Sequence, residues 1–507
     1  MLIVLVTLYF AVTIAIGLYA SRFVKSSGDY LVAGRSLPLY MNVATVFATW
    51  FGAETVLAVS STFMKEGLRG VVGDPFGASS CLILVAIFFA RPFYRLRLTT
   101  IGDFFRKRYN QTVEIGTGVA ITLSYLGWTS AQLVALGIVI NTVTGGAVSL
   151  AQGTVIGALI VMGYTMSGGM WAIALTDIFQ TVVIVLGLLY IAWLLGGMAG
   201  GFNAVIDKAS SAGKFDFWPS ASLRDWLAFI AAWATMAVGS VAQQDVFQRV
   251  TSAKDEKTAM RGSLIGGTFY LIFAFVPMFI AVSALLIDPA KVQATMAADG
   301  TDFQLVLPQM ILERTPLFAQ VLFFGALLSA ILSTASGALL APTAVLTENV
   351  LKPLVGARIS DKQGLRLLRV ILVLFTIGVT MFALLSESSM YQMVQNAYKV
   401  TLVAAFTPLA FGMFWTRATP QGASLSIIFG LIGWICAELL APEALLPPQF
   451  VGLGAAMTAM VVGSLLPTLF GGRGHPEIVA VAAAAAAPAG LSGQPAAGSP
   501  GDSRPAA

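Results

Sequence analysis

Long apolar runs separated by short polar segments dominate this chain. A helix needs about 20 apolar residues to cross a bilayer, and irregular backbone cannot face lipid. About thirteen runs approach that length. They lie near residues 2–20, 41–64, 73–91, 113–141, 149–167, 173–197, 224–247, 263–287, 317–347, 366–385, 393–414, 422–441 and 449–470. The sequence therefore predicts an all-α membrane protein with about 13 transmembrane helices.

Composition supports the same class and excludes others. Of 507 residues, 57% are hydrophobic and 10% are charged, whereas soluble domains carry about 25% charged residues. Cys81 and Cys436 lie in apolar runs, and the single histidine, His475, follows the last run. We expect no disulfide framework, no metal cluster and no cofactor. Because no nucleophile–base set appears, we expect no enzyme activity.

The basic residues indicate an orientation. Loops on the cytoplasmic side are rich in Lys and Arg. If the N-terminus lies outside and the C-terminus inside, most of these cations fall in cytoplasmic loops, chiefly within 91–108, 249–261 and 352–369. This explains the pI near 9.1 without a nucleic-acid partner. The run 2–20 has no basic start or cleavage site, so we expect a retained helix. Residues 473–507 have the composition of a disordered cytoplasmic tail.

Charges within the predicted spans are few. Charged side chains inside a membrane are costly and usually functional. Asp177, Asp245 and Lys399 lie in or near spans, and the two aspartates can also be ordinary interfacial residues. Glu54 is deeper, and needs either a structural partner or a function. Beside it, Gly52 weakens the helix centre. A broken helix frees carbonyl groups, which membranes tolerate where they line a cavity or bind an ion.

A cluster of hydroxyl groups occupies another uncharged run, in the segment "SAILSTASG" (329–337). Single serines in membrane helices commonly bond to their own backbone or pack on a neighbouring helix. Here Ser333 and Thr334 share one helix face with Ala330, and Ser336 borders it. Several neutral oxygens on one face favour a small hard cation such as Na⁺. The pattern predicts half of a sodium site.

Four ordered motifs carry a family resemblance. They are "GRSLP" (34–38), "YTMSGGMWAIALTDIFQ" (164–180), "DVFQRVTSA" (245–253) and "SAILSTASGALLAPTAVLTENV" (329–350). With them, residues 36–416 resemble the sodium:solute symporter family of sodium–galactose and sodium–proline transporters. The resemblance implies a leucine-transporter-like 5+5 inverted repeat, in which the second and seventh spans are broken.

The implied organisation has six parts. They are a first helix and cytoplasmic loop (1–37), a first repeat (38–197), an extracellular loop (198–223), a second repeat (224–416), two accessory helices (417–472) and the tail (473–507).

The resemblance also implies site residues. Sodium would bind the backbone carbonyls of Ala48, Phe51 and Ala330 and the hydroxyls of Ser333 and Thr334. Asp177 and Ser336 would hold a second sodium or assist sodium release. Gly337 replaces a serine found in some members, which weakens the case for a second ion.

For the substrate, "ATWFGAE" (48–54) is most similar to the choline transporters. Trp50 and Trp128 match tryptophans of their choline cage, whereas Gln243 replaces a third. Glu54 replaces a glycine. The tryptophans can alternatively serve packing or an aromatic belt. Glu54 would neutralise a substrate ammonium, and Lys399 would attract a carboxylate.

The sequence therefore predicts a plasma-membrane (bacterial inner-membrane) symporter that couples Na⁺ to import of a small polar organic solute of choline, betaine or proline type. Its partners would be this solute, Na⁺ and the lipid bilayer, with oligomeric state left open. One alternative is a proton-coupled carrier that uses Asp177 or Glu54, although neutral hydroxyls suit sodium better. The other is a transporter-like sensor, which no kinase or receiver segment supports.

Overall fold

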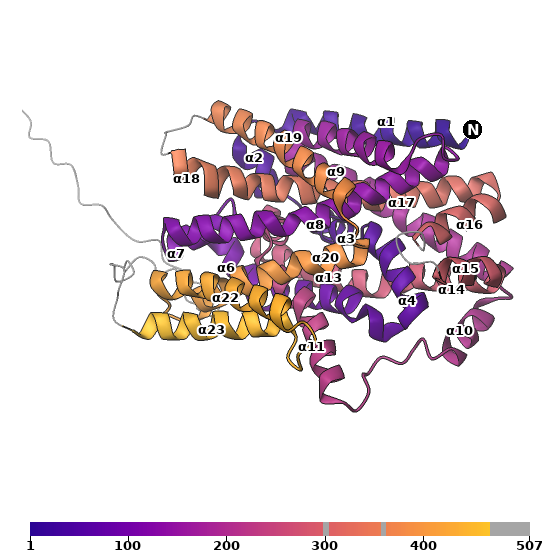
Figure 1. Cartoon of the computed structure of the whole chain (residues 1–507). Coiled ribbons are helices and arrows are strands. Elements are labelled where there is room, and N and C mark those ends of the chain that lie inside the picture. Colours follow the sequence, from indigo (N-terminus) through magenta and orange to yellow (C-terminus); the bar gives the residue numbers. More distant parts are fainter. Residues whose placement is uncertain (298–303, 356–360, 467–507) are drawn as a thin grey trace, which may run out of the picture.

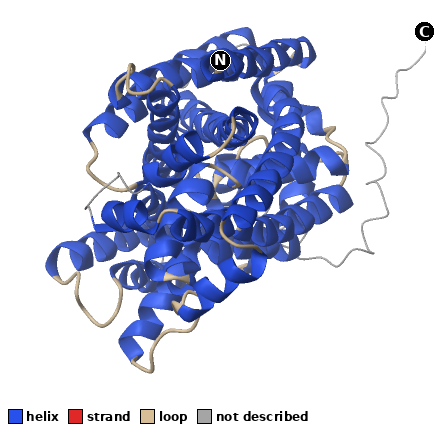
Figure 2. Ribbon diagram, turned by 90° about the vertical axis from the view of Figure 1, so that its right-hand side faces the viewer, coloured by secondary structure: helices blue, strands red, loops and turns tan. Residues whose placement is uncertain are grey.

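A computed structural model describes residues 1–297, 304–355 and 361–466, and within these ranges the chain forms helices and no β-strand. The long helices run side by side in one bundle (Figure 1), and helices fill the view turned by 90° as well (Figure 2). The α-helices are α1 (Leu2–Ala20), α2 (Ser27–Val32), α3 (Leu39–Trp50), α4 (Ser60–Glu66), α5 (Ala78–Leu84), α6 (Ala90–Arg95), α7 (Ile101–Arg108), α8 (Gln111–Val143), α9 (Leu150–Met198), α10 (Phe202–Ser211), α11 (Leu223–Ala237), α12 (Gln244–Ser252), α13 (Glu256–Phe273), α14 (Phe275–Ile287), α15 (Pro289–Ala297), α16 (Val306–Arg314), α17 (Leu317–Val345), α18 (Lys352–Val355), α19 (Asp361–Leu385), α20 (Met390–Thr401), α21 (Thr407–Phe414), α22 (Pro420–Leu440) and α23 (Pro448–Leu465). Short 3₁₀ or π-helical segments connect or extend them: η1 (Ser21–Phe23), η2 (Ala33–Arg35), η3 (Glu54–Val59), η4 (Leu68–Val71), η5 (Val72–Gly77), η6 (Val85–Phe89), η7 (Gly239–Ala242), η9 (Leu346–Leu351) and η10 (Leu402–Phe406).

Among the described residues, 11 helices are long and apolar enough to cross a membrane, or up to 12 if a bent pair counts as one span. This confirms the all-α membrane class. The number differs from the expected thirteen mainly at α9, whose 49 residues contain both predicted spans 149–167 and 173–197. A straight helix of that length would extend about 74 Å, far more than the roughly 30 Å of a hydrocarbon core.

Backbone geometry shows how α9 changes direction. Gly169 has φ 50° and ψ −137°, outside the helical region and accessible chiefly to glycine. Tyr164 and Asp177 lie on either side of it. The Tyr164 hydroxyl donates to the Leu332 carbonyl, and Asp177 accepts from the neighbouring Ser333. Because both halves of α9 meet α17 at the same level, the chain folds back at Gly169. The total of thirteen spans stays a prediction.

Two spans are interrupted, as expected for the second and seventh. The first is α3 and η3–α4, which meet at a bend of 54°. The second is α11 and α12. Between them lie η7 and Gln243, whose backbone is extended (φ −81°, ψ 143°). Both interruptions place polar side chains inside the bundle, among them the buried Glu54 and Gln243.

The ends of the bundle differ. In Figure 1, α7 and α18 lie at one end, and α10 and α15 lie at the other. The first end carries basic residues: Arg106, Lys107 and Arg108 on α7 and Lys352 on α18. In the predicted orientation this is the cytoplasmic end. That orientation and the repeat boundaries stay predictions. The predicted tail 473–507 and residues 467–472 lie outside the described residues.

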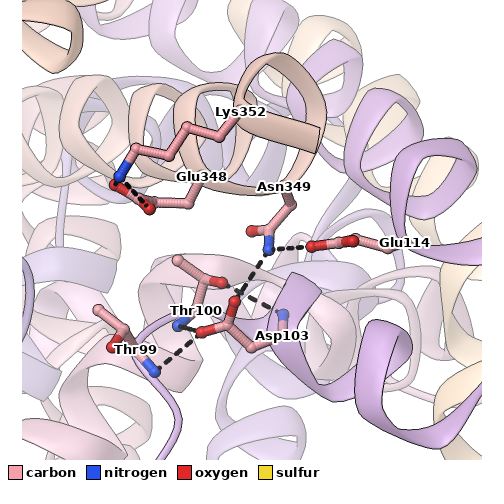
Figure 3. A network of polar contacts seen from close by, with 7 residues as sticks. All are labelled: Thr99, Thr100, Asp103, Glu114, Glu348, Asn349 and Lys352. Atoms are coloured by element: carbon pink, nitrogen blue, oxygen red, sulfur yellow. Dashed lines mark hydrogen bonds and ion pairs between the residues drawn. The ribbon is translucent and has the colours of Figure 1, made fainter. Parts of the chain in front are cut away.

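A buried polar junction fixes this end of α17 to α7 and α8. Asn349 of η9, which continues α17, donates to the carboxylates of Asp103 (3.1 Å) and Glu114 (2.9 Å). Figure 3 shows the Asn349 amide between the two acids. Asp103 also accepts hydrogen bonds from the N–H groups of Thr99 and Thr100, which directly precede α7. Since buried hydrogen-bonded networks rigidify their surroundings, the junction holds the helix of the hydroxyl cluster in place.

A second junction gives a test of the fold. The buried Arg108 guanidinium donates to the carbonyls of Gly412 (2.8 Å), Trp415 (3.0 Å) and Ala418 (3.1 Å), where α21 ends. A charged hydrogen bond contributes about 1.5–3 kcal/mol, so Arg108→Met should lower the melting temperature of the purified protein by several degrees. Lys107→Met, which removes an exposed charge from the same turn, is the control. An equal melting temperature for the two variants would contradict the capping role.

Candidate functional site

The break in α3 is the base of the site. Phe51 has φ −86° and ψ 76°, so the helix ends at Trp50 and restarts after Gly52. The Ala53 N–H donates to Oε1 of Gln132 on α8 (3.1 Å). In a continuous helix this N–H group would bond to a backbone carbonyl of the preceding turn. Here a side-chain oxygen accepts the hydrogen bond instead. The break keeps carbonyl groups of the Ala48–Phe51 turn available inside the bundle.

Helix α17 meets α3 at this break. Ala330, Ser333 and Thr334 are fully buried. The Thr334 hydroxyl donates to the Ala48 carbonyl (3.3 Å), which joins two of the five residues of the predicted sodium site. Phe51 lies at the break itself. The runs 41–64 and 317–347, which supply the predicted sodium ligands, therefore touch at this point. The set of ligands itself stays a prediction.

Asp177 lies beside the same cluster. The Ser333 hydroxyl donates to Asp177 Oδ1 (2.6 Å), while Oδ2 is buried without a hydrogen-bond partner. The Ser336 hydroxyl instead donates to the Ser333 carbonyl (2.9 Å), the ordinary local pattern. The structure thus brings Asp177 to Ser333, and it turns Ser336 toward its own backbone.

Three aromatic rings from three helices form a cluster next to the break. The Trp50 ring lies 6.2 Å from the ring of Trp128 and 6.2 Å from that of Tyr398, and the latter two rings are 6.0 Å apart. Their side chains are almost completely buried. Because all three lie inside the bundle, the alternative of a lipid-facing aromatic belt is wrong for Trp50 and Trp128. We call Trp50, Trp128 and Tyr398 the aromatic cluster.

Glu54 is anchored to this cluster. Its Oε1 accepts from Trp128 Nε1 (2.9 Å), and its Oε2 accepts from Gln132 Nε2. Both donors are neutral, and no Lys or Arg within the described ranges forms an ion pair with Glu54. Trp128 N–H cannot accept a hydrogen bond. Both carboxylate oxygens of Glu54 therefore accept a hydrogen bond from a neutral donor, and its side chain has no cationic partner among the described residues.

Gln243 lies near the aromatic cluster, whereas the side chain of Lys399 has other neighbours. Gln243 Nε2 donates to Ser124 (3.0 Å) and approaches Thr401 (3.4 Å), and its Oε1 is buried without a partner. Ser124 lies about one turn before Trp128 on α8, and Thr401 lies about one turn after Tyr398 on α20. Lys399 pairs with Glu438 (3.4 Å). It lines a separate cavity of about 520 Å³ with Tyr391 and Gln395, among others.

Sequence reasoning missed two parts of this region. Tyr398 completes the aromatic cluster, and only its position in a predicted span signalled it. Asp74 falls in the predicted span 73–91 and was overlooked among the intramembrane charges. It accepts a hydrogen bond from Tyr270, whose hydroxyl also contacts Thr55 (3.0 Å), the neighbour of Glu54. An acidic residue in the run "VVGDPFG" was the available signal.

Asp245 also has an explanation beyond a membrane interface. It is fully buried and accepts from the Tyr125 hydroxyl. On the same helix, Arg249 donates to Thr49 of α3 (2.9 Å). Arg249 therefore connects the second interrupted span to the first, and Asp245 connects it to Tyr125 of α8.

Comparisons with known proteins show transporters among the relatives of this chain. The chain is 23% identical to a high-affinity choline transporter 1 of Caenorhabditis elegans over 449 residues, which cover 85% of this chain and 76% of the relative. It is 23% identical to a sodium/glucose cotransporter of Vibrio parahaemolyticus over 460 residues, covering 84% and 83%. A solved Na⁺-coupled sialic acid symporter in a substrate-bound outward-open state matches with a TM-score of 0.79 at 18% identity, covering 92% of this chain and 98% of that one.

This structural likeness shows the leucine-transporter-like fold. The family model described as "Sodium:solute symporter family" matches residues 30–430, which is most of the chain. The match includes α3, α8, α17 and α20, the helices that carry the site. The chain therefore belongs to the sodium:solute symporter family.

Proposed function

We propose that this protein imports a small organic cation, or an amino-acid-like solute with a cationic group, together with Na⁺. Membership of the family makes it a Na⁺-coupled transporter and not an enzyme. The observation that carries the substrate class is the buried carboxylate of Glu54 held against the aromatic cluster. Cation–π attraction contributes about 2 kcal/mol or more when desolvated, and a quaternary ammonium of choline or betaine type would use both features.

The proposed sodium ligands are the carbonyls of Ala48, Phe51 and Ala330 and the hydroxyls of Ser333 and Thr334. An ion there would hold α3 against α17, which the Asn349 junction fixes at its cytoplasmic end. Sodium would thereby favour the arrangement in which Trp50 faces the substrate. It does so only by binding that arrangement more tightly. Asp177 and Ser336 would assist sodium release, and Gln243 would line the substrate side.

Transport would follow alternating access, in which one group of helices rocks around a site near the membrane midplane. In the predicted orientation, solute and Na⁺ enter the cytoplasm across the plasma membrane, for example a bacterial inner membrane.

Thermal stability of the purified protein tests the proposal. A ligand that binds only the folded state raises the melting temperature by mass action. The panel would contain choline, betaine, amino acids, polyamines, monocarboxylates and sugars, each with Na⁺ or with K⁺ at equal ionic strength. We expect a cationic solute to stabilise the protein only with Na⁺. A thermal shift that does not depend on Na⁺ but changes with pH would favour the proton-coupled alternative.

Trp50→Ala should weaken binding of the stabilising solute at least tenfold, since it removes one ring of the aromatic cluster. The measurement is the solute concentration that gives half of the maximal thermal shift at saturating Na⁺. Trp193→Ala is the matched control, because Trp193 is 72% exposed on α9. Unchanged solute affinity in Trp50→Ala would assign Trp50 to packing.

A further inference from the structure

Side-chain oxygens from three helices converge on Gly52. A Cβ built on this glycine would lie 2.7 Å from Thr334 Oγ1 and 3.0 Å from Gln132 Oε1, and closer still to Glu54 Oε2. These atoms belong to α17, α8 and η3. Real Cβ atoms essentially never approach other atoms below 3.0 Å. Glycine therefore lets the three oxygens come close to the backbone here, and any Cβ would force at least one of them to shift.

Each of the three oxygens retains the capacity to bind a cation. Thr334 gives its proton to the Ala48 carbonyl, so its lone pairs remain available. Gln132 Oε1 accepts one hydrogen bond, from Ala53, and a carbonyl oxygen has two lone pairs. Glu54 Oε2 accepts from Gln132 Nε2, and a carboxylate oxygen likewise accepts more than one partner.

The charge balance points to a cation as the occupant. A buried carboxylate without a counter-charge costs several kcal/mol. Glu54 receives hydrogen bonds from two neutral groups and, within the described ranges, no ion pair. Hard cations prefer oxygen ligands, and the neighbouring oxygens are a hydroxyl, an amide and the Ala48 carbonyl. One negative charge among neutral oxygens suits a monovalent ion.

We infer that Glu54, together with Gln132 and Thr334, binds Na⁺ over Gly52. The inference rests on the proposed function, because Thr334 is shared with the proposed sodium site. It adds a charged ligand to a site otherwise made of neutral groups. The other carboxylate oxygen of Glu54 holds Trp128. The Glu54 side chain would thus contact both the ion and the aromatic cluster. Bound sodium would orient the Trp128 ring for the substrate, and bound substrate would in turn raise the affinity for sodium.

Sodium binding without any solute tests this inference. The full-length protein would be titrated with NaCl, with KCl keeping the ionic strength constant, and followed by melting temperature and by tryptophan fluorescence, since Trp128 contacts Glu54. Glu54→Gln, which keeps the shape and removes the charge, should raise the half-maximal Na⁺ concentration at least tenfold. Glu54→Asp, which keeps the charge, should fall between this variant and the wild type, and it replaces Glu54→Gln if that variant does not fold. Glu66→Gln, at the exposed end of α4, should match the wild type.

Two results separate the inference from the proposed function. If Ser333→Ala/Thr334→Ala weakens Na⁺ binding while Glu54→Gln and Glu54→Asp match the wild type, the inference is wrong and the sodium site stands. If all of these variants bind Na⁺ as the wild type does, the proposed sodium site itself is wrong. Loss of solute binding in Glu54→Gln at saturating Na⁺, with an unchanged Na⁺ midpoint, would make Glu54 a substrate residue only.

Discussion

Replacing Gly52 with alanine should abolish sodium-dependent transport. The added Cβ would lie within 3.0 Å of oxygens of Glu54, Gln132 and Thr334. The ends of the Glu54 and Gln132 side chains can rotate away from the new Cβ only by leaving the position where we propose that they bind the ion. We expect no saturable Na⁺ stabilisation of the purified variant and no uptake of the solute identified by the thermal panel.

Gly325→Ala is the control for this variant. Gly325 is buried in α17, and a Cβ there would make an ordinary contact with Val183 at 3.7 Å. It should bind Na⁺ normally. Wild-type sodium dependence in Gly52→Ala would show that the space over Gly52 takes no part in ion binding.

The double variant Ser333→Ala/Thr334→Ala should raise the sodium concentration needed for half-maximal uptake at least tenfold. Two neutral ligands are lost, and tenfold corresponds to about 1.4 kcal/mol. The Thr334 contact with Ala48 is lost as well, which weakens the junction between α3 and α17. The measurement is initial uptake rate against external Na⁺ at saturating solute.

Thr343→Ala controls for general effects on α17. Thr343 is buried two to three turns along the same helix, and its hydroxyl donates to the Leu339 carbonyl (2.7 Å). Its removal should leave the sodium dependence unchanged. A double variant with the sodium dependence of the wild type would refute the assignment of Ser333 and Thr334 as ligands.

Local chemistry explains why much of the architecture was predictable. Apolar runs of about 20 residues specify membrane helices, and Gly52 beside Glu54 signalled the broken helix. The spacing of Ala330, Ser333 and Thr334 placed them on one face. Their meeting with Ala48 came from the family resemblance, because helical periodicity does not reveal which helices are neighbours.

Long-range contacts explain what the sequence did not reveal. Tyr398 joins Trp50 and Trp128 only through packing of α20 against α3 and α8, and Tyr270 reaches Asp74 from a helix nearly two hundred residues away. The break at Gly169 within α9, by contrast, falls between the two apolar runs 149–167 and 173–197 that the sequence already separates. Ser336 borders the hydroxyl face, and its hydroxyl donates to the Ser333 carbonyl of its own helix. Its part in sodium binding or release stays a prediction.

In the proposed mechanism, inward movement of sodium drives solute uptake. The most direct test places the purified protein in liposomes and imposes an inward Na⁺ gradient, with the solute from the thermal panel labelled outside. We expect accumulation above the external concentration, and we expect it to disappear when K⁺ replaces Na⁺ or when the Na⁺ gradient is collapsed. Accumulation that persists without Na⁺ and follows an inward proton gradient would contradict this mechanism.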